Sequence, residues 1–293
     1  MSARFQETGE VVAFGSLNGS ELYEKRAREA FPILVRQAKA HQTIYYSDLA
    51  DELSMPNPRN LNYVLGVIGN ELRRLTVQWK FEIPPIQCLV INKSTGMPGE
   101  GINWFIKDRA TYEQSSRRER KRLNDIMLHD VYSFDKLDEV LTNYELKPLD
   151  SSLPQTFQPR QGGSFGGQGE SPEHKHFKEY IAKNPKAIGL PMTLSQGSIE
   201  YEFPSADTVD VLFISKDEWI GVEVKAIRSP NDDLTRGIYQ CVKYRALMEA
   251  VQMANQKPPK ARVILALEGS LPQELVGLKN TLGVEVKEEI KSN

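Results

Sequence analysis

Hydrophobic and polar positions in the last third of the chain predict strands and helices in a regular order. Short runs rich in β-branched and aromatic residues indicate strands at residues 198–203, 208–215, 219–227 and 261–268, with a further short strand near the end at "VEVK". Helical spacing is found between and around them, in "SPEHKHFKEYIAKNP" and in "DDLTRGIYQCVKYRALMEAVQMA". The order predicts a mixed central sheet flanked by helices.

The first half of the chain has a different pattern, in which apolar residues recur at helical spacing. Helices are predicted in residues 19–42, in 43–55 with an N-cap near Ser47, and in 57–75 with Pro58 in the first turn. The stretch "PPIQCLVINKSTGMPGEG" predicts a strand followed by a turn rich in Gly and Pro, and residues 111–146 are charged and predicted to be helical. Three short helices with a strand and loop indicate an α+β winged-helix domain.

A segment poor in aliphatic residues separates these two regions. The stretch "PLDSSLPQTFQPRQGGSFGGQGES" is rich in Pro, Gly, Ser and Gln, so it cannot bury enough apolar surface to offset the entropy of ordering it. We therefore expect a domain at residues 1–147, a flexible linker at 148–169 and a second domain at 170–293.

Composition limits the classes of function. Residues 1–150 carry 20 Lys and Arg against 21 Asp and Glu, and residues 151–293 carry 17 against 18, so any nucleic-acid contact must come from local patches. The two cysteines lack the spacing of a metal site or a disulfide framework. Neither an apolar signal core nor a membrane-spanning run is present, and we expect a cytoplasmic protein with no membrane partner.

Two charged residues in the predicted strand "WIGVEVKAI" indicate a candidate functional site. Glu223 and Lys225 lie two residues apart and share one face of the strand, where burying an ion pair normally costs more than it returns. The preceding strand carries Asp210, and a tight turn between the strands can bring the two carboxylates together. With a backbone carbonyl they form an oxygen-ligand site suited to Mg²⁺, next to the Lys225 ammonium.

The pattern Asp-(x12)-Glu-Val-Lys on a hairpin, with a Glu-bearing helix before it and a Gln-bearing helix after it, resembles the PD-(D/E)XK nuclease superfamily. The resemblance covers about Glu170 to Asn293 and implies an α/β restriction-endonuclease-like fold and metal-dependent hydrolysis of phosphodiester bonds. It implies that Mg²⁺ (or Mn²⁺) is held by Asp210, Glu223 and the Val224 carbonyl. Lys225 would then orient water or stabilise charge on phosphorus.

Both flanking helices contribute further candidates by the same resemblance. Glu173 is the expected helix carboxylate, with Glu170 as the second choice. Gln240 is expected over the active site, with Lys243 and Tyr244 near the DNA on the same helix face.

The N-terminal region is similar to the DNA-binding domain of alkylguanine-DNA alkyltransferases and alkyltransferase-like proteins. Tyr46 falls at the family's tyrosine, "NPRNLNYVLG" on its recognition helix, Cys88 at its alkyl-accepting cysteine and Gly96 at its glycine. The cysteine lacks the neighbouring His and Arg, and Asn62 replaces the arginine that fills the place of an extruded base. The resemblance therefore implies a winged-helix fold and contact with DNA for this region, but not the alkyl-transfer reaction.

The residues expected to contact DNA through this domain lie at the start of the recognition helix: Tyr46, Arg59, Asn60, Asn62 and Tyr63. The basic run "RRERKR" at 117–122 is either a solvated helix face or a backbone contact.

Each of these residues also has a purely structural explanation. Glu-x-Lys occurs on solvated edge strands, Tyr244 packs in a core as readily as it binds DNA, and Arg236, His174 and His176 are expected to be exposed helix residues.

Together the motifs predict a Mg²⁺-dependent DNA endonuclease of restriction, repair or phage defence, with a possible homodimer for cutting both strands. The alternatives are a non-catalytic DNA-binding protein on a nuclease scaffold and, less favoured, an alkyl-damage repair protein that uses Cys88.

Overall fold

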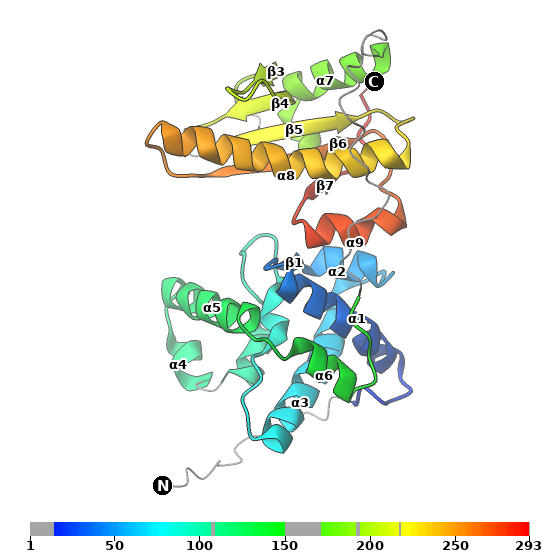
Figure 1. Ribbon diagram of the computed structural model, residues 1–293, viewed down its shortest axis with the longest axis vertical. Coiled ribbons are helices and arrows are strands. Elements are labelled where there is room, and N and C mark those ends of the chain that lie inside the picture. The colour runs from blue at the N-terminus through cyan, green and yellow to red at the C-terminus, as the bar shows by residue number, and fades with distance from the viewer. Residues whose placement is uncertain (1–14, 107–108, 150–170, 192–193, 217, 293) are drawn as a thin grey trace. The chain divides into compact units, whose positions relative to one another are not determined.

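The computed structural model describes residues 15–106, 109–149, 171–191, 194–216 and 218–292 (Figure 1). The chain divides into two compact units, Met1–Ser151 and Ser152–Asn293. Most of the expected linker, together with Glu170, lies outside the described residues.

Helices dominate the first unit. They are α1 (Leu22–Lys39), α2 (Tyr46–Glu52), α3 (Leu61–Trp79), α4 (Arg109–Gln114), α5 (Arg117–Tyr132) and α6 (Leu137–Asn143). Apolar residues at helical spacing on α1, among them Phe31 and Leu34, are buried in one core with Val64 and Ile68 of α3. The prediction that residues 111–146 are mainly helical is confirmed.

The prediction of a strand in this unit is mostly wrong. Residues Ile86–Leu89 form a turn of 3₁₀ helix (η2), and only β2 (Val90–Ile91) pairs, in parallel, with β1 (Ile44–Tyr45). Pro84 and Pro85 have no N–H to give to a ladder, and the Cys88 N–H bonds back to the Pro85 carbonyl at 3.0 Å, which closes the turn. The turn expected after the strand is present, closed by the Asn92 N–H to the Met97 carbonyl at 2.8 Å, with Gly96 at φ +66°.

The start of α2 also differs from expectation. The N-cap is Tyr45, not Ser47, because Tyr45 is held in extended conformation by its pairing with Ile91. The recognition-helix candidate begins with a 3₁₀ turn, η1 (Pro58–Asn60), in which the Asn57 side chain accepts a bond from the Arg59 N–H at 3.0 Å, and continues as α3.

The second unit contains a five-stranded mixed sheet with strand order β3-β4-β5-β6-β7. Its elements in chain order are α7 (Pro172–Lys183), β3 (Ser198–Glu202), β4 (Thr208–Ile214), β5 (Trp219–Lys225), α8 (Asn231–Ala254), β6 (Ala261–Leu267), α9 (Gln273–Thr281) and β7 (Glu285–Lys287). The first two pairings are antiparallel, and the last two are parallel. The predicted mixed sheet flanked by helices is confirmed.

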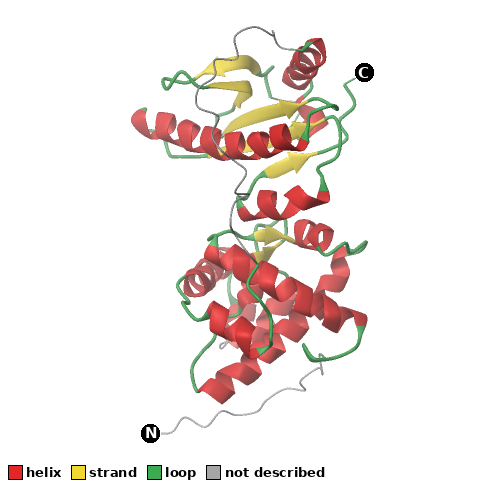
Figure 2. Ribbon diagram, turned by 45° about the vertical axis from the view of Figure 1, so that its right-hand side comes forward, coloured by secondary structure: helices red, strands yellow, loops and turns green. Residues whose placement is uncertain are grey.

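Helices cover both faces of this sheet (Figure 2). Leu234 and Ile238 of α8 and Leu275 of α9 share a core on one face, whereas Phe177 and Ile181 of α7 pack on the other with Val222 and Val224. The side chains of β5 therefore alternate between the faces as its sequence predicts. The polar residues Glu223 and Lys225 project toward the face that α8 covers.

Candidate active site

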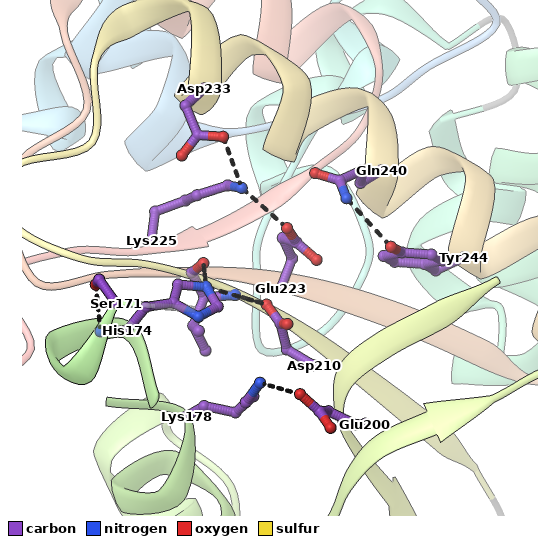
Figure 3. A network of polar contacts seen from close by, with 11 residues as sticks. Ser171, His174, Lys178, Glu200, Asp210, Glu223, Lys225, Asp233, Gln240 and Tyr244 are labelled. Carbon is purple, nitrogen blue, oxygen red and sulfur yellow. Dashed lines mark hydrogen bonds and ion pairs between the residues drawn. The ribbon is translucent and has the colours of Figure 1, made fainter. Parts of the chain in front are cut away.

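The hairpin of β4 and β5 brings the two predicted carboxylates together. Its register runs from Ile214 opposite Trp219 to Val211 opposite Val222, so that Asp210 and Glu223 are the next residues along the two strands. The Asp210 Oδ2 atom accepts a bond from the Val224 N–H at 2.9 Å, which fixes this carboxylate at the end of the ladder (Figure 3).

Lys225 is held between two carboxylates of different elements. Its Nζ lies 3.0 Å from Glu223 Oε1 on β5 and 3.1 Å from Asp233 Oδ1 in the first turn of α8. Lys225 and Glu223 are both buried. An ammonium with two anionic partners in a buried place remains charged, and these partners raise the pKa of Lys225 even though burial opposes them.

Glu223 has the opposite electrostatic environment. Burial first, and the nearby Asp210 charge second, raise the pKa of its carboxyl to about 8, against the attraction of Lys225. One ammonium therefore does not compensate the carboxylates gathered here. The site favours an additional positive charge beside Glu223 and Asp210.

The order of the charges shows where such a charge is needed. When Glu223 is ionised, the charges of Asp233, Lys225 and Glu223 alternate in sign, but Asp210, the next group, has the same sign as Glu223 (Figure 3). Among the described residues the ion-pair partner of Asp210 is His174, which carries charge only when it is protonated. A divalent cation near Asp210 and Glu223 would offset their repulsion.

His174 belongs to this site, which corrects the expectation that it is an exposed helix residue. Its Nε2 lies 3.1 Å from the Val224 carbonyl oxygen and 3.8 Å from Asp210 Oδ2. The Ser171 side chain caps α7 by accepting the His174 N–H at 3.2 Å, and this sets the direction of the first turn. His176 is exposed as expected, and its Nε2 lies 3.0 Å from the Ser292 carbonyl.

Glu173 is exposed in the same turn of α7. A bond to its own backbone and one to Ser171 lower the pKa of its carboxyl, so this carboxylate serves the helix N-terminus. Of the two neighbours, the structure brings His174, and not Glu173, to Asp210 and Val224.

Helix α8 places Gln240 and Tyr244 on the other side of the site. The Gln240 Nε2 donates to the Tyr244 hydroxyl at 3.2 Å, and the Gln240 Oε1 is buried with no hydrogen-bond partner in the described part of the chain. The Tyr244 ring is buried and stacks on Phe203, so the packing explanation fits the ring. Burial first, and the Glu223 charge second, raise the pKa of Tyr244.

Lys243 forms an ion pair with Asp207 at the turn before β4. Its side chain is half exposed, at 53%.

A close approach of α8 to β5 makes the Lys225 arrangement possible. A Cβ on Gly237 would lie 2.9 Å from Lys225 Cε and 2.9 Å from Leu265 Cδ1. A larger residue there would require the Lys225 stem or the Leu265 side chain to shift, whereas glycine leaves room for the lysine stem beneath the helix.

The groups that could hold a metal ion here are oxygen atoms of Asp210, Glu223 and Val224, with the imidazole of His174 beside them. In the part of the chain that the structure describes, no group of three or more His, Cys, Asp and Glu side chains is arranged to hold a metal ion. The oxygen-rich set has the chemistry that Mg²⁺ or Mn²⁺ requires.

The expected DNA contacts of the first unit are mainly at its surface. Arg59, Asn60, Asn62 and Tyr63 are exposed at η1 and the start of α3. Tyr46 is partly buried, and its hydroxyl accepts the Gly99 N–H at 3.2 Å, so it ties α2 to the loop after β2.

Within the basic run, Arg120 is engaged by carbonyl oxygens of Tyr112, Ser115 and Glu113, which makes it a structural link between α4 and α5. The other four cations of the run are exposed.

The environment of Cys88 is that of a core residue. The thiol is buried, and burial together with the Asp130 charge raises its pKa to about 12. A thiol with this pKa forms almost no thiolate at neutral pH, so it is a poor nucleophile.

Comparison with known proteins finds no matching family model, no matching curated protein and no matching solved structure. In the described residues no helix is both long and apolar enough to cross a membrane.

Sequence reasoning missed two members of the site, His174 and Asp233. The Ser171 cap indicates that His174 lies in the first turn of the helix that precedes the hairpin, but it does not show whether His174 or Glu173 faces the sheet. Asp233 had no signal in the sequence, because its contact with Lys225 depends on how closely α8 packs on β5.

Proposed function

We propose that the second unit hydrolyses phosphodiester bonds of DNA with the help of Mg²⁺ or Mn²⁺. The observation that supports this most directly is the pair of neighbouring carboxyl groups, the partly buried Asp210 and the buried Glu223, beside Lys225, which two carboxylates hold in place. Ionising both of these carboxyl groups is costly unless a cation compensates their charge. The mixed sheet and the order of its elements are compatible with the PD-(D/E)XK nuclease fold that the motif resembles.

In the proposed mechanism, Asp210, Glu223 and the Val224 carbonyl would hold the cation. The His174 imidazole, in place of Glu173, would donate from Nε2 to the Val224 carbonyl and orient this ligand beside Asp210. When bound, the cation supplies Lewis-acid polarisation of the phosphate and lowers the pKa of a coordinated water. Lys225 donates from its ammonium to the attacking water or to the phosphate oxygens as charge builds on phosphorus. Asp233 keeps Lys225 in place when Glu223 shares its charge with the cation.

The first unit is proposed to bind DNA as a winged-helix, alkyltransferase-like module in a cytoplasmic protein. The exposed side chains of Arg59, Asn60, Asn62 and Tyr63 at the start of α3 support this role. A module that recognises DNA joined to one that cuts it fits restriction, repair or phage defence. Cutting both strands would be served by a homodimer, because the described residues of each chain form one such site.

The module is further proposed to recognise modified bases. Binding assays that give equal affinities for modified and unmodified duplexes would remove this part of the proposal.

Plasmid DNA incubated with the full-length protein tests the nuclease proposal. We expect nicking or cutting with Mg²⁺ or Mn²⁺ and none with EDTA, and we expect Asp210→Asn and Lys225→Met to lose activity. Asp232→Asn, which changes an exposed neighbour of Asp233 on α8, is the matched control and should cut normally.

The same assay separates the rival functions. DNA binding without cleavage under every metal condition would favour a non-catalytic protein on a nuclease scaffold. Transfer of a labelled methyl group to Cys88 would favour alkyl repair, which the raised pKa of this thiol opposes.

A further inference from the structure

A second buried lysine lies one helical turn from His174. Lys178 is on α7, four residues after His174, so both side chains project from one face of the helix. The ammonium of Lys178 lies 2.7 Å from Glu200 Oε1 on β3. Its side chain is 4% exposed, whereas that of Glu200 is 60% exposed.

Glu200 lies next to the candidate active site across the sheet. Its neighbours Ile199 and Tyr201 pair with Val211 and Val209, so Asp210 is the residue of β4 that faces it. Glu200, Asp210 and Glu223 therefore occupy successive places across three strands. The Lys178–Glu200 pair lies on the side of Asp210 that is remote from Glu223.

Two features of the pair are unfavourable for a merely structural contact. An ammonium buried this deeply loses its hydration, and apolar residues of similar size replace buried ion pairs at little cost. In addition, Glu200 has φ +52°, a left-handed conformation that a glutamate in a strand rarely adopts. A strained residue beside an active site is a reason to look for a function.

We propose that Lys178 is a second phosphate-binding cation of the active site and that Glu200 covers it until DNA binds. This inference rests on the proposed nuclease function. The exposed Glu200 carboxylate stands in for a backbone phosphate next to the one that is cleaved, because both are anionic oxygen groups that accept from an ammonium. Incoming DNA displaces the Glu200 side chain toward solvent, and Lys178 then contacts the phosphate.

DNA affinity of the full-length protein tests this inference without relying on cleavage. Fluorescence anisotropy with a labelled duplex is measured in Ca²⁺, which has the same charge and preference for oxygen ligands as Mg²⁺. Lys178→Met should weaken binding by about tenfold and lower the salt dependence by about one phosphate contact. Glu200→Gln should tighten binding by about threefold, because a neutral cover is easier to displace.

The double variant separates covering from simple repulsion of DNA. If Glu200 acts by covering Lys178, Glu200→Gln has no effect in the Lys178→Met background. If it only repels DNA, the same gain persists there and the inference is overturned. Glu179→Gln is the control. It changes a carboxylate on α7 that is paired with Lys183, and it should leave the affinity for DNA unchanged.

Other outcomes are equally decisive. Wild-type affinity in Lys178→Met, in a protein that cuts DNA with Mg²⁺, overturns this inference and leaves the nuclease function intact. A wild-type protein that neither binds nor cuts DNA overturns both.

Discussion

The carboxyl group of Glu223 connects the chemistry of the site to the stability of the protein. Its pKa is raised from the ordinary 4.5 to about 8, chiefly by burial and then by Asp210. Between these two pH values the unfolded chain has released the proton that the folded chain still holds, so stability falls as pH rises and levels off above about 8. Without metal, the site costs the protein stability in alkaline solution.

Relative to the wild type, the Glu223→Gln variant should therefore be stabilised more at pH 8.5 than at pH 5. The amide removes the charge that is costly to bury, while Lys225 keeps Asp233 as a partner. The difference in unfolding free energy between variant and wild type should grow by about 3 kcal/mol between the two pH values. Urea denaturation in EDTA measures it, with Glu179→Gln, a change of a half-exposed carboxylate on α7, as the control. A difference that does not change with pH would contradict the assigned environment.

His174 and Glu173 provide a matched pair of neighbours. Only His174 lies against Val224 and Asp210, at 3.1 and 3.8 Å, whereas Glu173 is exposed. We expect His174→Ala to weaken Mn²⁺ binding by about tenfold. Glu173→Ala should change it by less than about twofold. Titration calorimetry measures both, and the reverse order would restore Glu173 to the site.

The sequence predicts the residues of the hairpin better than those of the helices around it. Asp210, Glu223 and Lys225 could be found because strand periodicity and a short turn determine which residues become neighbours. Glu173 was preferred to His174 because the resemblance predicts a carboxylate. Successive side chains on a helix point about 100° apart, and the sequence alone does not show whether Glu173 or His174 faces the sheet.

At the scale of elements, the approach of α8 to β5 determines the position of Lys225. Gly237→Ala should displace the lysine stem, because the new Cβ would lie 2.9 Å from Lys225 Cε. We expect a loss of metal-dependent DNA cleavage of about tenfold or more, since misplacement by about 1 Å is costly in catalysis.

Gly101→Ala is the control, because nothing lies within 4 Å of a Cβ there. Full activity in Gly237→Ala with an unmoved Lys225 would show that α8 does not constrain the site. Thermal melts identify any variant that fails to fold.

The elements themselves were predictable to different degrees. The strands and helices of the second unit follow from clear periodicity, and their order is as expected. In the first unit the run "CLVI" reads as the end of a strand, but the two prolines before it hold the chain in a 3₁₀ turn up to Leu89. Apolar content alone did not distinguish these outcomes.

At the scale of the whole molecule, the two compact units should act together on DNA. Joining two binding modules raises the effective concentration of the second at the same duplex. We expect the full chain to bind a duplex at least about tenfold more tightly than residues 1–147 or 170–293 alone. Anisotropy measures all three, and circular dichroism checks that each fragment folds. Equal affinity for the full chain and one fragment would assign DNA binding to that fragment alone.

The central claim is that Asp210 and Glu223 hold a divalent cation beside Lys225. Electron paramagnetic resonance of Mn²⁺ bound to the full-length protein tests it most directly, because it reports the ion without requiring a substrate. The account predicts saturable binding by the wild type and by Asp232→Asn, and loss of that binding in Asp210→Asn. Mn²⁺ binding that Asp210→Asn leaves unchanged, or no binding by the wild type, would contradict it.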